Sequence, residues 1–179
     1  SYIKLLKAQI DRYLQNPGRA IQSVSESSFD AWVKFYRQDE NSNNAGTSYY
    51  NKGCLVALCL DMGLRLRGSR LEALLRKLYE NAQNGIQVNE RTIVDLCNEL
   101  TGDDWIEQIN HLINTTDELP LDQLLPEFGL SYTLKNDNAL PFGLKVTDKA
   151  EGVVIQNVRR ESSAAKAGFS SNDVIFAIA

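Results

Sequence analysis

The chain has 179 residues, of which 43% are hydrophobic and 23% are charged, a balance typical of a folded globular protein. The formal net charge of −4 argues against a general nucleic-acid binder, because such proteins need a basic face to neutralise phosphates. No stretch reaches about 20 uninterrupted apolar residues, so no membrane span is expected.

The first part of the chain, from Tyr2 to about Asn114, has the hydrophobic period of helices. Its apolar residues recur at three- and four-residue spacing, as in Ile3, Leu6 and Ile10, which is the pattern of an amphipathic helix. The start lacks the hydrophobic centre and cleavage site of a secretory peptide. Because it begins like the middle of a helix, we expect an excised piece of a longer protein.

Turn residues divide this helical part. Pro17-Gly18 is expected to end the first helix, and Ser28 is expected to cap a helix over residues 29–36. Three aromatic residues share one face of that helix: Phe29, Trp32 and Tyr36. Residues 39–46, which read DENSNNAG, are predicted to form a turn-rich loop.

A long helix is predicted from about Ser48 to Arg67. It is apolar nearly all round, so it should lie at the centre of the fold. Gly68 is expected to close it, and residues 69–72 are expected to form a capping box for a helix over 70–81.

Two further helices are predicted, one capped by Asn89 and one over residues 104–113. The chain has three cysteines: Cys54, Cys59 and Cys97. The first two lie five apart, which is not the two-residue spacing of metal or redox pairs. All three are expected to be small buried hydrophobic residues.

After Pro120 the pattern changes from helical to extended. Short extended segments are predicted at 131–134, 143–146, 152–158 and 173–179, with one short helix over 162–167 stopped by Gly168. We therefore predict three regions: a helical part over 1–119, a connector over 120–139 and a β-rich part over 140–179.

Two tyrosines stand at the start of the long helix. Side chains lean toward the N-terminus of a helix, so Tyr49 and Tyr50 should point beyond its end. Helix N-termini favour negative charge, and a neutral phenol could there donate a hydrogen bond to an oxyanion. The structural alternative, a buried tyrosine bonded to a backbone carbonyl, stays open for both.

A string of motifs resembles the C-terminal part of the glycyl aminopeptidase family of zinc metallopeptidases. In chain order the motifs are Ser28-Phe-Asp-Ala-Trp32, Tyr49-Tyr-Asn-Lys-Gly53, the LDMGLR segment and Leu100-Thr-Gly-Asp103. The resemblance covers most of residues 2–132. It implies a thermolysin-like catalytic region, a helical region and a C-terminal PDZ domain.

The same resemblance implies a role for Tyr50. The segment Tyr50-Asn-Lys-Gly53 is similar to the Tyr-Glu-Lys-Gly segment of the broader zinc aminopeptidases, whose tyrosine donates to the tetrahedral intermediate. That role falls on Tyr50, as oxyanion donor in the complete enzyme. Tyr49 and Lys52 receive no chemistry from it.

The zinc site of such enzymes needs two histidines at i and i+4 with a glutamate between them. This chain has one histidine, His111, so no such motif exists here and we expect no metal bound by these residues. The resemblance implies that the ligands lie upstream of the segment that matches Tyr2. We expect His111 to be a surface residue, and Asp103, Asp104 and Glu107 to cap and charge a helix start.

The last part of the chain is similar to the opening of a bacterial PDZ domain. The matching segments are Phe142-Gly-Leu144, residues 151–158, residues 163–168 and residues 172–175. The resemblance implies that Phe142, Gly143 and Leu144 offer backbone N–H groups to the terminal carboxylate of a peptide. The alternative is that Gly143 only makes a tight turn.

The resemblance also implies further strands and a second helix beyond Ala179. An unpaired strand edge invites partners. We therefore expect an incomplete domain, strands borrowed from a second molecule in a strand-swapped oligomer, or partial disorder.

The expected fold is mainly α, the helical C-terminal part of a thermolysin-like peptidase region followed by a partial β-rich PDZ domain. The expected function is that of a fragment of a zinc-dependent aminopeptidase, which hydrolyses N-terminal residues of peptides and is inactive alone. The alternatives are a non-catalytic helical scaffold with a PDZ-type peptide-binding module, and a degenerate peptidase kept for assembly. Substrate preference and compartment, bacterial cytoplasm or periplasm, are left open.

Overall fold

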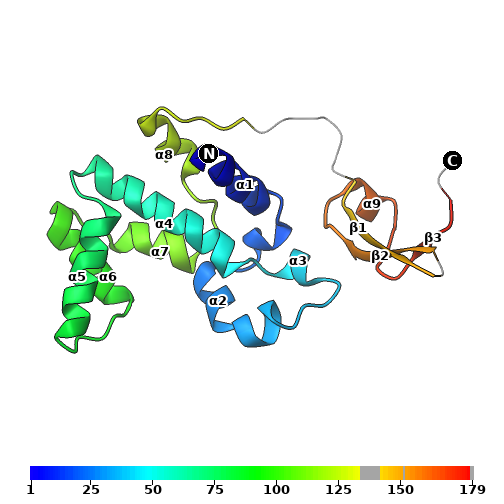
Figure 1. The fold of residues 1–179 in the computed structure, drawn as a ribbon, viewed down its shortest axis with the longest axis horizontal. Coiled ribbons are helices and arrows are strands. Elements are labelled where there is room, and N and C mark those ends of the chain that lie inside the picture. Colours follow the sequence, from blue (N-terminus) through cyan, green and yellow to red (C-terminus); the bar gives the residue numbers. More distant parts are fainter. Residues whose placement is uncertain (134–141, 151, 178–179) are drawn as a thin grey trace.

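The computed structural model describes residues 1–133, 142–150 and 152–177. Figure 1 shows a mainly helical molecule with a small antiparallel sheet toward the C-terminus. The predicted mainly helical class with a small C-terminal β part is therefore confirmed. In the described part of the chain, no helix combines the length and apolar character needed to cross a bilayer.

The helical body is built from α-helices and shorter helical turns. They are α1 (Tyr2–Leu14), the 3-10 helix η1 (Pro17–Ala20), α2 (Val24–Phe29), the π-helix η2 (Ala31–Phe35), α3 (Ser42–Ala45), α4 (Tyr49–Leu66), α5 (Leu71–Gln83), α6 (Glu90–Thr101), α7 (Ile106–Asn114), α8 (Leu121–Leu124) and the 3-10 helix η3 (Leu125–Phe128). The sheet region contains β1 (Leu144–Lys149), β2 (Gly152–Val158), α9 (Ser163–Lys166) and β3 (Val174–Ile175).

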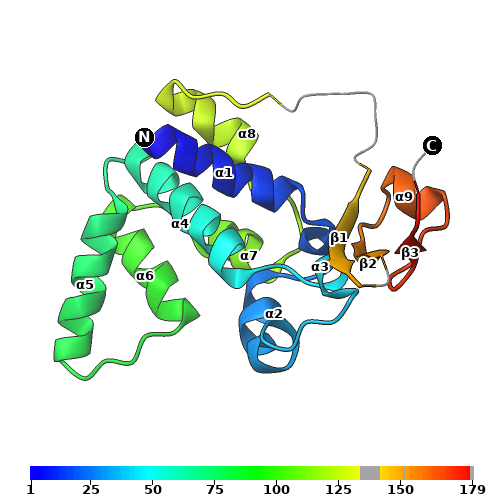
Figure 2. The ribbon, with the colours of Figure 1, turned by 45° about the vertical axis from the view of Figure 1, so that its right-hand side comes forward.

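Helix α4 lies at the centre of the helical body, as its all-round apolar sequence predicted. It contacts α1, α2, α5, α7 and α8, and Figure 2 shows it beside α1. Its N-cap is Ser48, whose side chain accepts a hydrogen bond from the Asn51 N–H at 3.3 Å. Gly68 follows its end with φ +80°, the left-handed conformation that glycine adopts at low cost.

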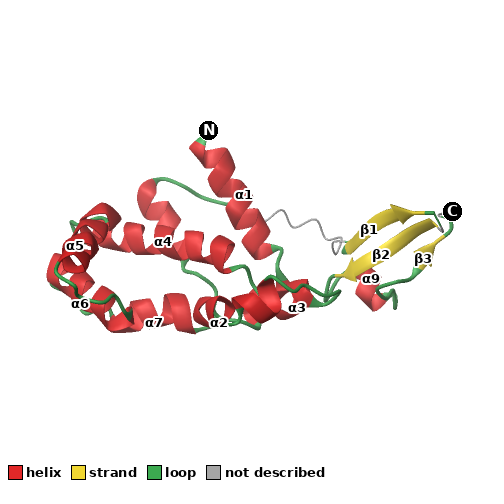
Figure 3. Ribbon diagram, turned by 60° about the horizontal axis from the view of Figure 1, so that its bottom comes forward, coloured by secondary structure: helices red, strands yellow, loops and turns green. Residues whose placement is uncertain are grey.

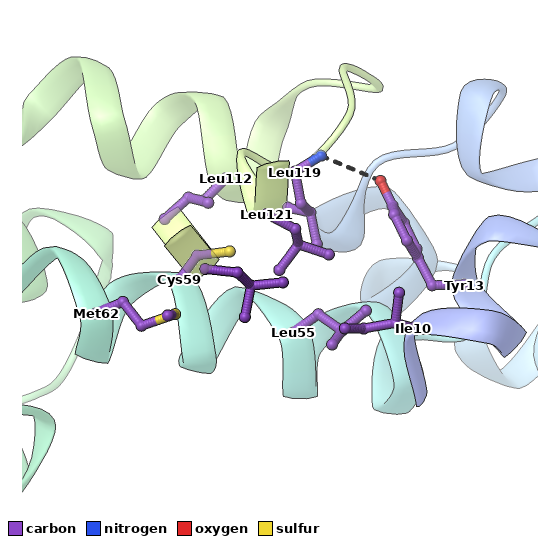
Figure 4. Packing of buried hydrophobic residues seen from close by; sticks show 9 residues of the cluster. Ile10, Tyr13, Leu55, Cys59, Met62, Leu112, Leu119 and Leu121 are labelled. Carbon is purple, nitrogen blue, oxygen red and sulfur yellow. Dashed lines mark hydrogen bonds between the residues drawn. The ribbon is translucent and has the colours of Figure 1, made fainter. Parts of the chain in front are cut away.

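The first hydrophobic core joins α4 to α1, α7 and the chain around α8 (Figure 4). Its buried members are Ile10, Tyr13, Leu55, Cys59, Met62, Leu112, Leu119, Leu121 and Leu125. Each fully buried leucine contributes about 1.5–3 kcal/mol. Residues 119–125, at the start of the predicted connector, thus pack into the helical body.

Tyr13 anchors a polar edge of this core. Its hydroxyl donates to Glu118 Oε2 at 3.0 Å and accepts from the Leu119 N–H at 3.2 Å, the dashed line in Figure 4. Arg19 Nε bonds the other oxygen of the same carboxylate at 2.9 Å. The network ties α1 and η1 to the segment before α8.

The second core joins the C-terminal half of α4 to α5, α6 and α7. Its buried members are Leu64, Leu74, Val94, Leu96, Cys97, Trp105 and Ile109. Trp105 packs directly on Gly63, where an added Cβ would lie 2.9 Å from the indole ring. The Arg67 guanidinium covers the ring at 4.7 Å from its centroid.

Two predicted helix starts are wrong. Ser28 is not an N-cap, because Ser23 already begins the helix with a capping box that includes Glu26. Ser28 therefore lies inside α2. Residues 69–72 form no capping box either, because Asp61 Oδ1 of α4 accepts the Leu71 N–H at 2.8 Å and caps α5 from outside. Asn89 caps α6 as predicted.

The loop predicted over residues 39–46 contains the short helix α3. Before it, η1 approaches the end of α3 so closely that a Cβ on Gly18 would lie 2.0 Å from the Gly46 carbonyl oxygen. That distance is far below van der Waals contact, so the chain can pass there only with glycine at position 18.

The sheet has the order β1-β2-β3, and both strand pairs are antiparallel. The strand predicted over 152–158 is confirmed as β2. The strand predicted at 143–146 runs on to Lys149, whereas β3 covers Val174–Ile175 of the predicted 173–179. Residues 131–133 form no strand. Residues 134, 178 and 179 lie outside the described residues.

Polar contacts join the sheet region to α3 and the loop before it. Asn44 Nδ2 donates to the Val158 carbonyl at 2.8 Å, and Asn44 Oδ1 accepts the Arg160 N–H at 2.8 Å. Asn157 Nδ2 donates to the Glu40 carbonyl. Figure 3 shows the sheet at one end of the helical body and α5 with α6 at the other.

Candidate functional site

The start of α4 and the end of η2 bring three tyrosines together, which we call the tyrosine cluster: Tyr36, Tyr49 and Tyr50. The Tyr36 hydroxyl lies 3.0 Å from the Tyr49 hydroxyl and 3.1 Å from the Tyr50 hydroxyl. Tyr50 is 60% exposed. The Tyr50 side chain therefore faces outward, where a ligand can reach it. Its hydroxyl also bonds to that of Tyr36.

Phe35 packs in the middle of the tyrosine cluster. Its ring centroid lies 5.2 Å from that of Tyr36, 5.3 Å from that of Tyr49 and 5.9 Å from that of Tyr50. Trp32 adds a further contact at 5.1 Å from Tyr36. Such tilted and edge-to-face contacts are the favoured geometry of aromatic pairs.

A π-helix positions Tyr36. The Tyr36 N–H bonds the Ala31 carbonyl at 2.9 Å, a spacing one residue wider than in an α-helix, and such widened turns are frequent at functional sites. We predicted an α-helix here with Tyr36 on one face, so its approach to Tyr50 was missed. The available signal was the run of aromatic residues itself, from Trp32 through Phe35 to Tyr36.

The hydrogen bonds of the cluster shift the pKa values of Tyr49 and Tyr50 in opposite directions. The bond from Tyr36 is the main cause that lowers the pKa of Tyr50, because it stabilises the Tyr50 phenolate. The bond to Tyr36 is the main cause that raises the pKa of Tyr49. A more acidic phenol is a stronger hydrogen-bond donor, so Tyr50 is the better donor of the two.

A pocket of about 330 Å³ lies beside the cluster, between η2 and the segment that leads to α4. Its lining includes Phe35 and Ser48, the chain neighbours of Tyr36 and Tyr49, and does not include the three tyrosines themselves. Asp39 contributes a carboxylate, which already accepts the Ser42 hydroxyl at 2.7 Å and the Asn41 N–H at 3.0 Å.

The described residues do not fit a zinc site. They include no group of three or more His, Cys, Asp or Glu side chains that could hold a metal ion. His111 Nδ1 lies 3.5 Å from Asp117 Oδ2, and Asp103 pairs with Arg67 at 2.6 Å. Asp104 Oδ1 accepts the Ile106 N–H at 3.1 Å. Each of these acids thus has a local structural partner.

The cysteines divide into two environments. Cys59 and Cys97 are buried as predicted, and burial raises the pKa of Cys59 to about 12 and that of Cys97 to about 11. The prediction for Cys54 is wrong, because this residue is exposed. It lies one turn after Tyr50 on the outward face of α4, which the apolar sequence pattern did not distinguish from the inward one.

Lys52, the lysine of the Tyr-x-Lys-Gly segment, is fully buried. Its ammonium donates to the Thr115 carbonyl at 3.5 Å, and burial lowers its pKa while the nearby Glu118 opposes that shift. Lys52 therefore points into the helical body, whereas Tyr50 points out of it. The structure gives the two residues of the segment different surroundings.

Phe142, Gly143 and Leu144 lie where the chain enters β1. Gly143 has φ +78°, and a Cβ there would meet the Ser162 side chain at 2.2 Å. The Phe142 carbonyl accepts the Ala164 N–H at 3.1 Å, and the Gly143 carbonyl accepts the Arg159 N–H at 2.8 Å. These bonds hold the loop against α9 and against the residue that follows β2. The role of Phe142, Gly143 and Leu144 in peptide binding stays a prediction.

Comparison with known proteins supports part of the resemblance. The family model for M61 glycyl aminopeptidase matches residues 1–56, a segment that includes all three members of the tyrosine cluster. No curated protein gives a significant match to the chain. Beyond residue 56 the resemblance rests on the sequence motifs.

Proposed function

We propose that this chain is part of an M61-type zinc aminopeptidase, in which the Tyr50 hydroxyl stabilises the oxyanion formed when an N-terminal residue is cleaved from a peptide. The match to the glycyl aminopeptidase family over residues 1–56 supports the reaction class. The observation that carries the proposal is the accessible Tyr50 hydroxyl at the N-terminal end of a central helix.

Several properties of this position suit an oxyanion donor. The first turn of α4 carries the positive end of the helix dipole, which favours negative charge nearby. Tyr50 is fixed by its neighbours Tyr36 and Phe35, so little reorganisation is needed when charge develops. Its lowered pKa strengthens its hydrogen bond to that charge.

Zinc would supply Lewis-acid activation of the scissile carbonyl in this family. Because the described residues do not fit a zinc site, we propose that its ligands come from another part of the complete protein. The 179-residue chain alone is then inactive. The contribution of this chain is the phenol donor and the helical body that holds it.

The test is the substitution Tyr50→Phe in the complete enzyme, assayed on an aminoacyl chromogenic substrate such as a glycyl anilide. We expect kcat to fall by about 10²- to 10³-fold, the range for the loss of one oxyanion donor. The matched control is Tyr79→Phe, which removes another exposed phenol, bonded to Gln83 on α5. Near wild-type turnover of Tyr50→Phe would remove Tyr50 from the mechanism.

A second candidate function is peptide binding by the sheet region, through a PDZ-type loop at Phe142, Gly143 and Leu144. The left-handed Gly143 and the exposed Phe142 ring beside Phe169 favour it. Its test is fluorescence anisotropy with a labelled peptide that ends in a free carboxylate and with the same peptide amidated. We expect binding of the carboxylate form alone, lost in Gly143→Val, and equal binding of both forms would contradict the proposal.

A further inference from the structure

Tyr36 connects the other two members of the tyrosine cluster through its hydroxyl. Its hydroxyl lies within hydrogen-bond distance of both Tyr49 and Tyr50. A phenol carries a single proton, although its oxygen can accept hydrogen bonds as well. Tyr36 can therefore donate to one neighbour only, and must accept from the other.

The proton arrangements that satisfy the cluster fall into two classes, according to whether Tyr50 accepts or donates. In the first, Tyr49 donates to Tyr36 and Tyr36 donates to Tyr50, so the Tyr50 proton has no acceptor inside the cluster. In the second, Tyr50 donates to Tyr36, and its proton is already used. Tyr50 is the more exposed of the two ends, so in the first arrangement the spare proton lies where a ligand can reach it.

We infer that Tyr36 is a positioning residue that holds the Tyr50 oxygen as a hydrogen-bond acceptor and leaves the Tyr50 proton free for an oxygen atom of the substrate. Since Tyr36 acts through Tyr50, its role rests on the function proposed above for Tyr50. Tyr36 itself need not touch the substrate.

The packing around Tyr36 supports a fixed orientation. Its ring centroid lies 5.1 Å from that of Trp32 and 5.2 Å from that of Phe35, and the Phe35 ring is perpendicular to it. The π-helix ends at Phe35, so the widened turn delivers Tyr36 directly to the first turn of α4. A side chain with this many ring contacts loses little freedom when it bonds Tyr50.

The acidity of the cluster agrees with the first arrangement. The pKa of Tyr50 is lowered and that of Tyr49 is raised, as expected when Tyr50 accepts and Tyr49 donates. The titratable groups that act on Tyr50 are Tyr36 and Tyr49. The ammonium of Lys34, on the same π-helix, is paired with Asp30.

The first test titrates Tyr50 by tyrosinate absorbance in the full 179-residue chain, without any assay of turnover. The difference between wild type and Tyr50→Phe isolates the titration of Tyr50. The difference between Tyr36→Phe and the double variant isolates it again without the Tyr36 hydroxyl. We expect a higher midpoint for Tyr50 when Tyr36 is phenylalanine, and an unchanged midpoint overturns the inference.

The second test measures kinetics in the complete enzyme. Tyr36→Phe keeps the ring contacts and removes only the hydroxyl, so we expect kcat to fall by about tenfold, the scale of one hydrogen bond, with KM unchanged. The control Tyr79→Phe should retain full kcat. Circular dichroism of each variant checks that the helical body is intact.

The outcomes separate this inference from the proposed function. A shifted titration with reduced kcat supports the role of Tyr36. A Tyr36→Phe enzyme with full kcat, alongside an impaired Tyr50→Phe enzyme, overturns it. If Tyr50→Phe itself keeps full turnover, the proposed function fails, and the titration alone then decides whether Tyr36 holds Tyr50.

Discussion

The helical body and the sheet region are stabilised in different ways. The helical body buries two clusters of large side chains, around Leu55 and around Trp105. In the described sheet region the buried hydrophobic residues are Val154, Ile155 and Ala164, and buried polar groups such as Asn157 lie beside them. Burial of apolar surface therefore supports the first region, whereas the second also depends on polar contacts with α3.

The exposed residues show the same difference. The sheet region leaves several large side chains open to solvent: Phe142, Val146, Phe169 and Phe176. Among the described residues, β1 and β3 stand at the edges of the sheet, and open strand edges invite pairing with another chain. The predicted strand-swapped oligomer stays a prediction, and this surface is where it would form.

The largest effect is expected from truncating one buried side chain in the core of each region and comparing the loss of stability. Leu55→Ala should lower the free energy of unfolding of the helical body by about 2–5 kcal/mol, because Leu55 of α4 is fully buried in the first hydrophobic core. Ile155→Ala, at an equally buried site of the sheet, should leave the main helical transition unchanged. Urea unfolding followed by far-ultraviolet circular dichroism measures both.

The control for this comparison is Leu66→Ala, at an exposed residue of α4, which should change the same transition by about 0.5 kcal/mol or less. A single transition destabilised equally by Leu55→Ala and Ile155→Ala would show that the two regions unfold together. The contrast between them would then be wrong.

A smaller effect is expected where the two regions meet. Asn44→Ala removes the side chain that bonds both the Val158 carbonyl and the Arg160 N–H, a loss of about 1–3 kcal/mol for the groups left behind. We expect faster amide hydrogen exchange along β2, while amides of α4 keep their protection. Asn43→Ala is the matched control, and unchanged exchange in β2 would mean that the sheet does not depend on α3.

Local signals in the sequence predicted much of this molecule. The all-round apolar pattern of α4, the Asn89 cap and the alternation of β2 each describe a segment by its own residues, and all three are confirmed. The position of Tyr50 at the start of α4 followed from the same pattern. Its catalytic role stays a prediction.

Contacts between distant segments could not be predicted in this way. The cap of α5 comes from Asp61 on the preceding helix, so no box within residues 69–72 was needed. The approach of Tyr36 to Tyr50 depends on a π-turn and on how α2 packs against α4. Neither the π-turn nor this packing produces a periodic pattern in the sequence. The exposure of Cys54 was missed for the same reason.

The close contact between Gly18 of η1 and Gly46 lies just before the start of α4, where Tyr49 and Tyr50 stand. Gly46 stands two residues before Ser48, whose side chain begins α4. A methyl group at position 18 would push this backbone aside, and the shift would pass through Ser48 to Tyr49 and Tyr50. A substitution of residue 18 is therefore expected to move Tyr49 and Tyr50, although residue 18 touches neither ring.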